Sequence, residues 1–139
     1  MTTTADTLAR VPMFLALNRK ALDRLERITR ERSYKAGDDI VREGDEGVGF
    51  FLITRGKVDV VRGGTHLNTL GEGDFFGEMA LLDNHRRSAT VRAVEPTTCL
   101  AMLRSDFLAE LRANADIGVE MLAYMSQRLR ELDERLADE

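Results

Sequence analysis

The spacing of hydrophobic and polar residues divides this chain into three zones. Residues 1–32 have helical spacing, residues 33–103 have short β-type runs, and residues 105–139 return to helical spacing. In the middle zone, runs such as FFLIT and VDVVR alternate with single or paired glycines. Turns at such short, regular intervals are typical of a small closed all-β structure. The pattern therefore predicts one domain over residues 1–139, mainly β with flanking helices.

The N-terminal zone predicts one helix that packs on the β structure. Leu22, Leu25 and Ile28 recur on one face of this helix. Asn18 can cap its start, and we expect it to end near Arg30.

The C-terminal zone predicts two helices. Ser105 caps the first, which runs to about Ala113, and Ala115 or Asp116 opens the longer second one. Hydrophobic residues of the second helix have the 3,4,3,4 spacing of a coiled-coil seam. The alternative is that this face packs on its own domain, but we favour a homodimer. The seam residues are Leu122, Met125, Leu129, Leu132 and Leu136.

Composition restricts the possible partners. The chain has 139 residues and a formal net charge of −4, which argues against a nucleic-acid surface, since phosphate contacts demand clustered Lys and Arg. No helix-turn-helix segment follows the last helix. We expect the single cysteine, Cys99, to be a small apolar strand residue in a reducing compartment. Neither a secretory signal nor a membrane span is recognisable, so we expect a cytoplasmic protein without nucleic-acid or membrane partners.

The segment FFGEMALLDNHRRSATV, residues 75–91, gathers groups suited to a phosphate. Gly77 lacks a Cβ, so its backbone can approach a ligand and adopt dihedral angles that other residues resist. A short helical turn is expected over residues 78–82. The amides of Met79 and Ala80 should lack carbonyl partners within it and form a small anion site.

The same segment also carries side chains suited to the two ends of a cyclic sugar phosphate. Glu78 is an acceptor when ionised, which suits a ribose hydroxyl. Arg87 offers a planar fork of donors for two phosphate oxygens. Ser88 adds a hydroxyl donor, and the amide of Ala89 can add another. These residues predict an anion-and-sugar site.

The motifs FGEMALL and RRSATV resemble the phosphate-binding cassette of cyclic nucleotide-binding domains. Such domains occur in the catabolite activator and FNR group of bacterial regulators, in protein kinase A regulatory subunits and in cyclic-nucleotide-gated channels. The glycine-punctuated stretch 37–61 and the Leu-rich C-terminal helix extend the resemblance to nearly the whole chain. It implies an eight-stranded antiparallel β-roll of the jelly-roll type, with an N-terminal helix and two C-terminal helices.

The resemblance also implies roles for individual residues. Glu78 would hold the ribose 2'-hydroxyl and Arg87 the cyclic phosphate, while Gly77, Ala80, Ser88 and Ala89 would line the same pocket. Further candidates for contact with the sugar or base are Val60, Leu67, Arg128 and Leu132. The alternative for Val60 and Leu67 is a place in the core, and for Arg128 a solvated place on the helix surface. The implied ligand is cAMP or cGMP, which is a regulatory ligand rather than a cofactor.

These observations predict a regulatory sensor that is not an enzyme and that signals through its C-terminal helices to an unknown effector protein. One alternative is a degenerate fold that dimerises without ligand, since Leu132 and Asp133 stand where the catabolite activator has hydroxyl residues. A cupin-like metalloenzyme is a second alternative, but it needs a cluster of His and carboxylate ligands. His66 and His85 are the only histidines and form no His-x-His pair. We therefore expect no metal and no catalytic residue.

Overall fold

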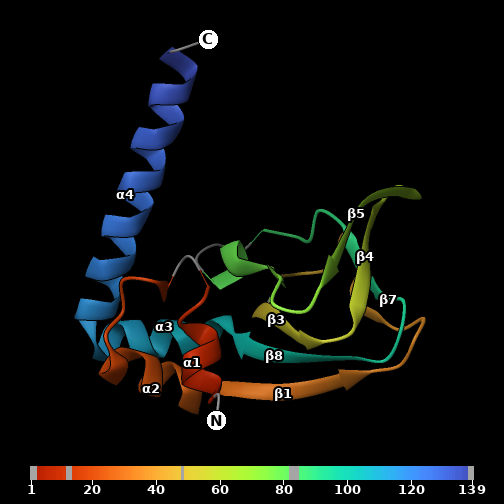
Figure 1. The fold of residues 1–139 in the computed structure, drawn as a ribbon, viewed down its shortest axis with the longest axis horizontal. Coiled ribbons are helices and arrows are strands. Elements are labelled where there is room, and N and C mark those ends of the chain that lie inside the picture. Colours follow the sequence, from red (N-terminus) through yellow and green to blue (C-terminus); the bar gives the residue numbers. More distant parts are fainter. Residues whose placement is uncertain (1–2, 12–13, 48, 82–84, 138–139) are drawn as a thin grey trace. The chain divides into compact units, whose positions relative to one another are not determined.

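The described part of the chain contains eight strands in two antiparallel four-stranded sheets (Figure 1). This computed structural model describes residues 3–11, 14–47, 49–81 and 85–137, excluding the side chains of Glu78 and Met79. The first sheet has the order β1 (Thr29–Tyr34), β8 (Thr97–Leu103), β3 (Gly49–Arg55), β6 (Phe75–Phe76). The second has the order β2 (Asp39–Val41), β7 (Thr90–Ala93), β4 (Lys57–Arg62), β5 (Thr65–Gly71). The predicted eight-stranded β-roll is confirmed.

The core of the β-roll joins the two sheets. Ile53 of β3 and Cys99 of β8 come from one sheet, and Val58 of β4 and Val91 of β7 come from the other, and all four are buried in one cluster. Burial raises the pKa of the Cys99 thiol to about 11, because it disfavours the thiolate. The expected role of Cys99 as a small apolar strand residue is confirmed.

Four α-helices precede and follow the strands in the described chain: α1 (Thr4–Leu8), α2 (Arg19–Arg27), α3 (Arg104–Ala113) and α4 (Ala115–Ala137). The Asn18 side chain accepts the Ala21 amide at 2.9 Å, so the predicted cap of α2 is confirmed. Helix α1 is an addition to the prediction. Its start is a capping box in which Thr3 and Asp6 bond to each other's backbone amides.

The predicted boundary between the N-terminal zone and the β zone is wrong. Helix α2 ends at Arg27, and β1 begins at Thr29 rather than at Ser33. The reason is that β1 is an edge strand whose central residues, 30–33, are exposed. Such a strand needs no alternating hydrophobic residues, and charged side chains suit it because they discourage pairing with another chain.

The chain folds into two compact units. One unit, residues 28–108, holds the β-roll, and the other, residues 1–27 and 109–139, holds α1, α2 and α4. Within the described residues, no helix combines the length and apolar character that crossing a bilayer requires.

The burial of β3 predicts how substitutions in it change the free energy of unfolding. Leu52 is 2% exposed, whereas Leu67 of β5 is 48% exposed. We expect Leu52→Ala to lower the free energy of unfolding by about 2–5 kcal/mol, because it leaves a cavity in the core. The control Leu67→Ala should stay within about 0.5 kcal/mol. Urea unfolding followed by circular dichroism measures both, and equal losses would contradict this account of the core.

Candidate functional site

A cavity of about 490 Å³ lies within the β-roll unit. Its apolar wall comes from strands of both sheets and consists of Val41, Val60, Phe75, Phe76 and Val91. The polar lining residues come from the segment that precedes β7 and include Arg86, Arg87 and Ser88. One apolar wall and a few convergent polar groups are typical of a small-molecule site.

The guanidinium of Arg87 is the central charge of this cavity. Its Nη2 donates to the Gly49 carbonyl oxygen at 2.6 Å, while its buried Nε has no hydrogen-bond partner among the described residues. Burial lowers the pKa of Arg87, because it disfavours the cation. Among the side chains that the structure describes, no carboxylate forms an ion pair with it. A half-buried cation with an unused donor is therefore available to an anion.

The backbone of Arg87 is fixed by the loop after β2. Its amide donates to the Asp45 carbonyl at 2.7 Å, and its carbonyl accepts the Gly44 amide at 2.9 Å. The neighbouring Arg86 donates from Nη1 to the Gly44 carbonyl at 2.8 Å. These bonds hold the cassette against the loop and set the direction in which the Arg87 side chain leaves the backbone.

Gly77 is required where the chain passes the Arg87 side chain. Its φ is +77°, a backbone conformation that other L-residues rarely adopt. A Cβ at this position would overlap the guanidinium of Arg87 and would lie 2.7 Å from the Gly49 carbonyl oxygen. The expectation that Gly77 adopts unusual dihedral angles is confirmed.

The structure brings most of the predicted cassette residues to one cavity. Gly77, Ala80, Arg87, Ser88 and Ala89 line it, as does Val60 of β4. The predicted turn appears as a short 3₁₀ helix, η2 (Glu78–Leu81). The side chains of Glu78 and Met79, like Leu82, lie outside the described residues.

The prediction that the Ala80 amide is a free donor is wrong. The sequence predicts a free amide at Ala80, but this amide donates to the Gly77 carbonyl at 3.0 Å. A 3₁₀ turn forms its hydrogen bonds one residue earlier than an α-helix does, so the third amide is already paired. Ala80 lines the cavity, but its N–H is already paired.

The more distant candidates lie elsewhere in the chain. Leu67 is exposed on β5 and is not among the residues that line the cavity. Arg128 and Leu132 belong to α4 in the other unit, where Arg128 donates to Glu131 at 3.2 Å. Four of the seam leucines are exposed: Leu122 (64%), Leu129 (64%), Leu132 (46%) and Leu136 (66%). The fifth seam residue, Met125, is partly buried.

Several cavity residues were not predicted individually, among them Val41, Phe76, His85 and Val91. Val41 and Val91 meet because β2 pairs with β7, and the register pairs Val41 with Val91. The sequence does carry one signal for Val41, which is its place beside Ile40 in a short β-type run. It carries no signal for the partner strand.

A comparison with known families decides the identity of the fold. The family model for the cyclic nucleotide-binding domain matches residues 31–114. The chain belongs to this family. The match includes both sheets of the cyclic nucleotide-binding domain apart from the start of β1, and the whole cavity.

Relatives of this domain occur in proteins of different kinds. The cyclic AMP receptor protein of Thermus thermophilus is 38% identical over 129 residues, 88% of this chain and 59% of that protein. The cGMP-dependent protein kinase of Eimeria tenella is 37% identical over 103 residues, 74% of this chain but 10% of the kinase. The chain therefore spans little more than half of the first relative and a small part of the second.

Solved structures share the fold. The N-terminal domain of a transcriptional regulator from Streptomyces coelicolor A3(2) superposes with a TM-score of 0.86 at 28% identity, over 93% of this chain and 96% of that one. The Thermus thermophilus catabolite activator protein superposes with a TM-score of 0.70 at 38% identity, over 91% and 62%.

The family is one of ligand-binding regulatory domains rather than of enzymes, which is the class that the motifs predict. In the described part of the cyclic nucleotide-binding domain, no group of three or more His, Cys, Asp and Glu residues is placed to hold a metal ion.

Two of the positive-φ glycines, Gly73 and Gly77, make a matched pair for testing the close approach at the site. Gly73 has a φ of +90° with open space around it, whereas Gly77 faces Arg87 and Gly49. We expect Gly73→Ala to cost about 1–2 kcal/mol of unfolding free energy from backbone strain alone. Gly77→Ala should cost about 1–3 kcal/mol more, because overpacking is added to that strain. Thermal unfolding of both variants checks this, and equal costs would mean that the site has room for a methyl group.

Proposed function

We propose that the cavity binds a cyclic nucleotide and that the phosphate sits on Arg87. The unpartnered, buried Nε of that guanidinium carries this proposal. Among the described residues, the Arg87 guanidinium donates to the Gly49 carbonyl alone, which leaves most donors of its fork for an anion with two oxygens. In the proposal, Ser88 adds its hydroxyl beside the same phosphate.

The rest of the cavity suits the sugar and base. A volume of about 490 Å³ falls within the range of small-molecule sites, about 300–1,000 Å³. The valines at positions 41, 60 and 91 offer an apolar surface for the ribose and purine. Glu78 is proposed to accept the 2'-hydroxyl of the ribose.

We propose cAMP as the regulatory ligand, with cGMP as the alternative. The relatives include one named for each nucleotide, the Thermus thermophilus receptor and the Eimeria tenella kinase. Ser88 bears on this choice, because a hydroxyl at the phosphate end can also reach a guanine amino group. Arg128 and Leu132 are proposed to approach the base, and Leu67 to contact the sugar or base.

The proposed output is a change in how the C-terminal helices pack. Four exposed leucines on α4 would be covered in a homodimer, and covering them removes apolar surface from water. Occupancy can shift this packing only as far as the nucleotide binds one arrangement more tightly. A coupling of about 1–3 kcal/mol is ordinary for such a device. An effector protein would then read the arrangement in the cytoplasm.

A second candidate function is a dimerisation module that needs no ligand. The exposed leucines of α4 favour it, because an apolar seam can pair whether or not the cavity is filled. Titration with nucleotide separates the two candidates, since this module would release no heat of binding.

The first test is calorimetric titration of the wild type with cAMP and cGMP. We expect Arg87→Ala to weaken binding by about one to two decades, because a charge-assisted hydrogen bond contributes about 1.5–3 kcal/mol. Arg87→Lys should recover only part of this loss, since a lysine keeps the charge without the fork. Glu78→Ala should weaken binding of the cyclic nucleotide, whose ribose it would contact, but should not weaken binding of inorganic phosphate.

The control for Arg87→Ala is Arg55→Ala, which removes the same charge from an exposed position on β3 outside the cavity. This variant should bind cAMP within about twofold of the wild type, because a twofold change in affinity is a free-energy difference smaller than RT. Undiminished binding by Arg87→Ala would refute the assignment of the phosphate.

The second test concerns the seam of α4. We expect light scattering to show a dimer at micromolar concentration, and Leu129→Asp to dissociate it, because a carboxylate in an apolar seam is desolvated without a partner. Gln127→Asp adds the same charge on the opposite side of the helix and should leave the dimer intact. A wild type that is monomeric with and without nucleotide would rule out the seam.

A further inference from the structure

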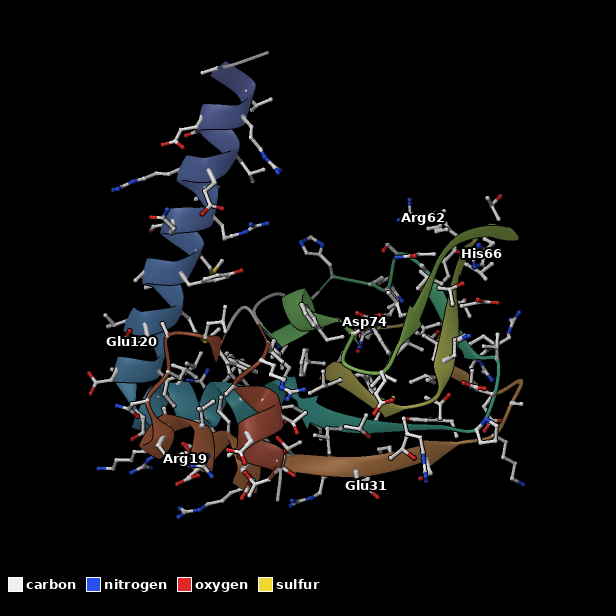
Figure 2. The ribbon with its side chains drawn as sticks, viewed as in Figure 1. Arg19, Glu31, Arg62, His66, Asp74 and Glu120 are labelled. Carbon is white, nitrogen blue, oxygen red and sulfur yellow. The ribbon has the colours of Figure 1, made fainter. Side chains whose placement is uncertain are left out.

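The tip of the β4–β5 hairpin is tied to the cassette by a side chain that does not line the cavity. Arg62, the last residue of β4, donates from Nε to the Ser88 carbonyl oxygen at 2.9 Å. Figure 2 shows Arg62 near His66 at this end of the hairpin. Ser88 lines the cavity, but Arg62 does not. The contact therefore reaches the site from outside.

The geometry of the peptide bond relates the contact at the Ser88 carbonyl to the direction of the Ala89 amide. The Ser88 carbonyl and the Ala89 amide belong to one planar trans peptide, so they point in opposite directions. When Arg62 holds the carbonyl on the hairpin side, the Ala89 N–H is turned to the other side of the backbone. Ala89 lines the cavity, and its amide has no hydrogen-bond partner within the described chain. The bond from Arg62 thus fixes the direction of a free donor.

A second residue keeps the hairpin tip in place. The Glu43 carboxylate accepts the Gly63 amide at 2.9 Å, and the Glu43 amide donates to the Thr90 hydroxyl at 3.0 Å. The register pairs Val61 with Thr90 across β4 and β7. Three segments distant in sequence therefore meet around residues 88–90. The tip cannot move without disturbing the peptide that follows Ser88.

We propose that Arg62 is a positioning residue for the nucleotide phosphate. It holds the Ser88–Ala89 peptide so that the Ala89 amide donates to one exocyclic phosphate oxygen, while Arg87 supplies the charge. Glu43 supports Arg62 by fixing the adjacent turn. This inference rests on the proposed function, because it assigns a donor to the same phosphate.

The test compares Arg62→Ala with the wild type by calorimetric titration with cAMP. We expect binding to weaken about threefold to tenfold, the size of one hydrogen bond. Arg62→Lys should recover part of the affinity, because its ammonium can still reach the carbonyl. Glu43→Ala should weaken binding in the same direction and by less. Arg55→Ala, which removes an equal charge without this contact, should stay within about twofold.

Two readouts separate positioning from a general loss of structure. The amide proton of Ala89 should move downfield in the NMR spectrum when cAMP binds the wild type, and should move less in Arg62→Ala. The two phosphorothioate diastereomers of cAMP replace different exocyclic oxygens by sulfur. Their affinity ratio should fall toward one in Arg62→Ala, because the donor that distinguishes the oxygens is no longer held.

The outcomes distinguish this inference from the function on which it rests. A wild type that binds neither cAMP nor cGMP overturns both. Normal wild-type binding with Arg62→Ala within about twofold overturns the role of Arg62 alone. Weaker binding by Arg62→Ala with an unchanged Ala89 shift and diastereomer ratio also overturns it, because Arg62 would then act through another group.

Discussion

The half-buried guanidinium of Arg87 is the constraint on which the site depends. Removing a cation from water is costly unless polar groups replace the water. Here the Gly49 carbonyl replaces part of it, and within the part of the chain that the structure describes one buried N–H has no partner. The surrounding backbone is shaped accordingly. A glycine at position 77 leaves room for the side chain, and the loop containing Gly44 and Asp45 holds its backbone.

The wall of the cavity is also part of the core of the β-roll. Val91 belongs to the buried cluster with Ile53 and Cys99, and it lines the cavity as well. Val41, Val60 and Phe76 pack against the same cluster while they remain partly buried. A ligand in the cavity would complete the burial of these side chains. Ligand binding and the stability of the β-roll would therefore be linked through shared atoms, as is usual when a site is built into a close-packed core.

Features of this molecule that depend on neighbouring residues could be predicted from the sequence, whereas features that depend on strand pairing could not. The glycine spacing predicts the β-roll, Asn18 predicts its helix cap, and the cassette motif predicts that Gly77 and Arg87 share a site. The start of β1 escapes prediction because an exposed edge strand needs no hydrophobic alternation. The contacts of Val41 and Arg62 could not be predicted, because they depend on the strand register and on the folded β4–β5 hairpin. The pairing of the Ala80 amide depends on whether the turn is 3₁₀ or α, which composition does not decide.

The cavity and the surface of α4 would become interdependent if one equilibrium connected them. The cavity presents an unused cationic donor, and α4 presents a row of exposed leucines in the other compact unit. If nucleotide strengthens pairing of the helices, thermodynamic linkage requires that pairing strengthen nucleotide binding by the same factor. The affinity of the site would then depend on protein concentration. A cavity that acts alone would show no such dependence, so a coupling of this kind would lie in the equilibrium between states and not in either surface by itself.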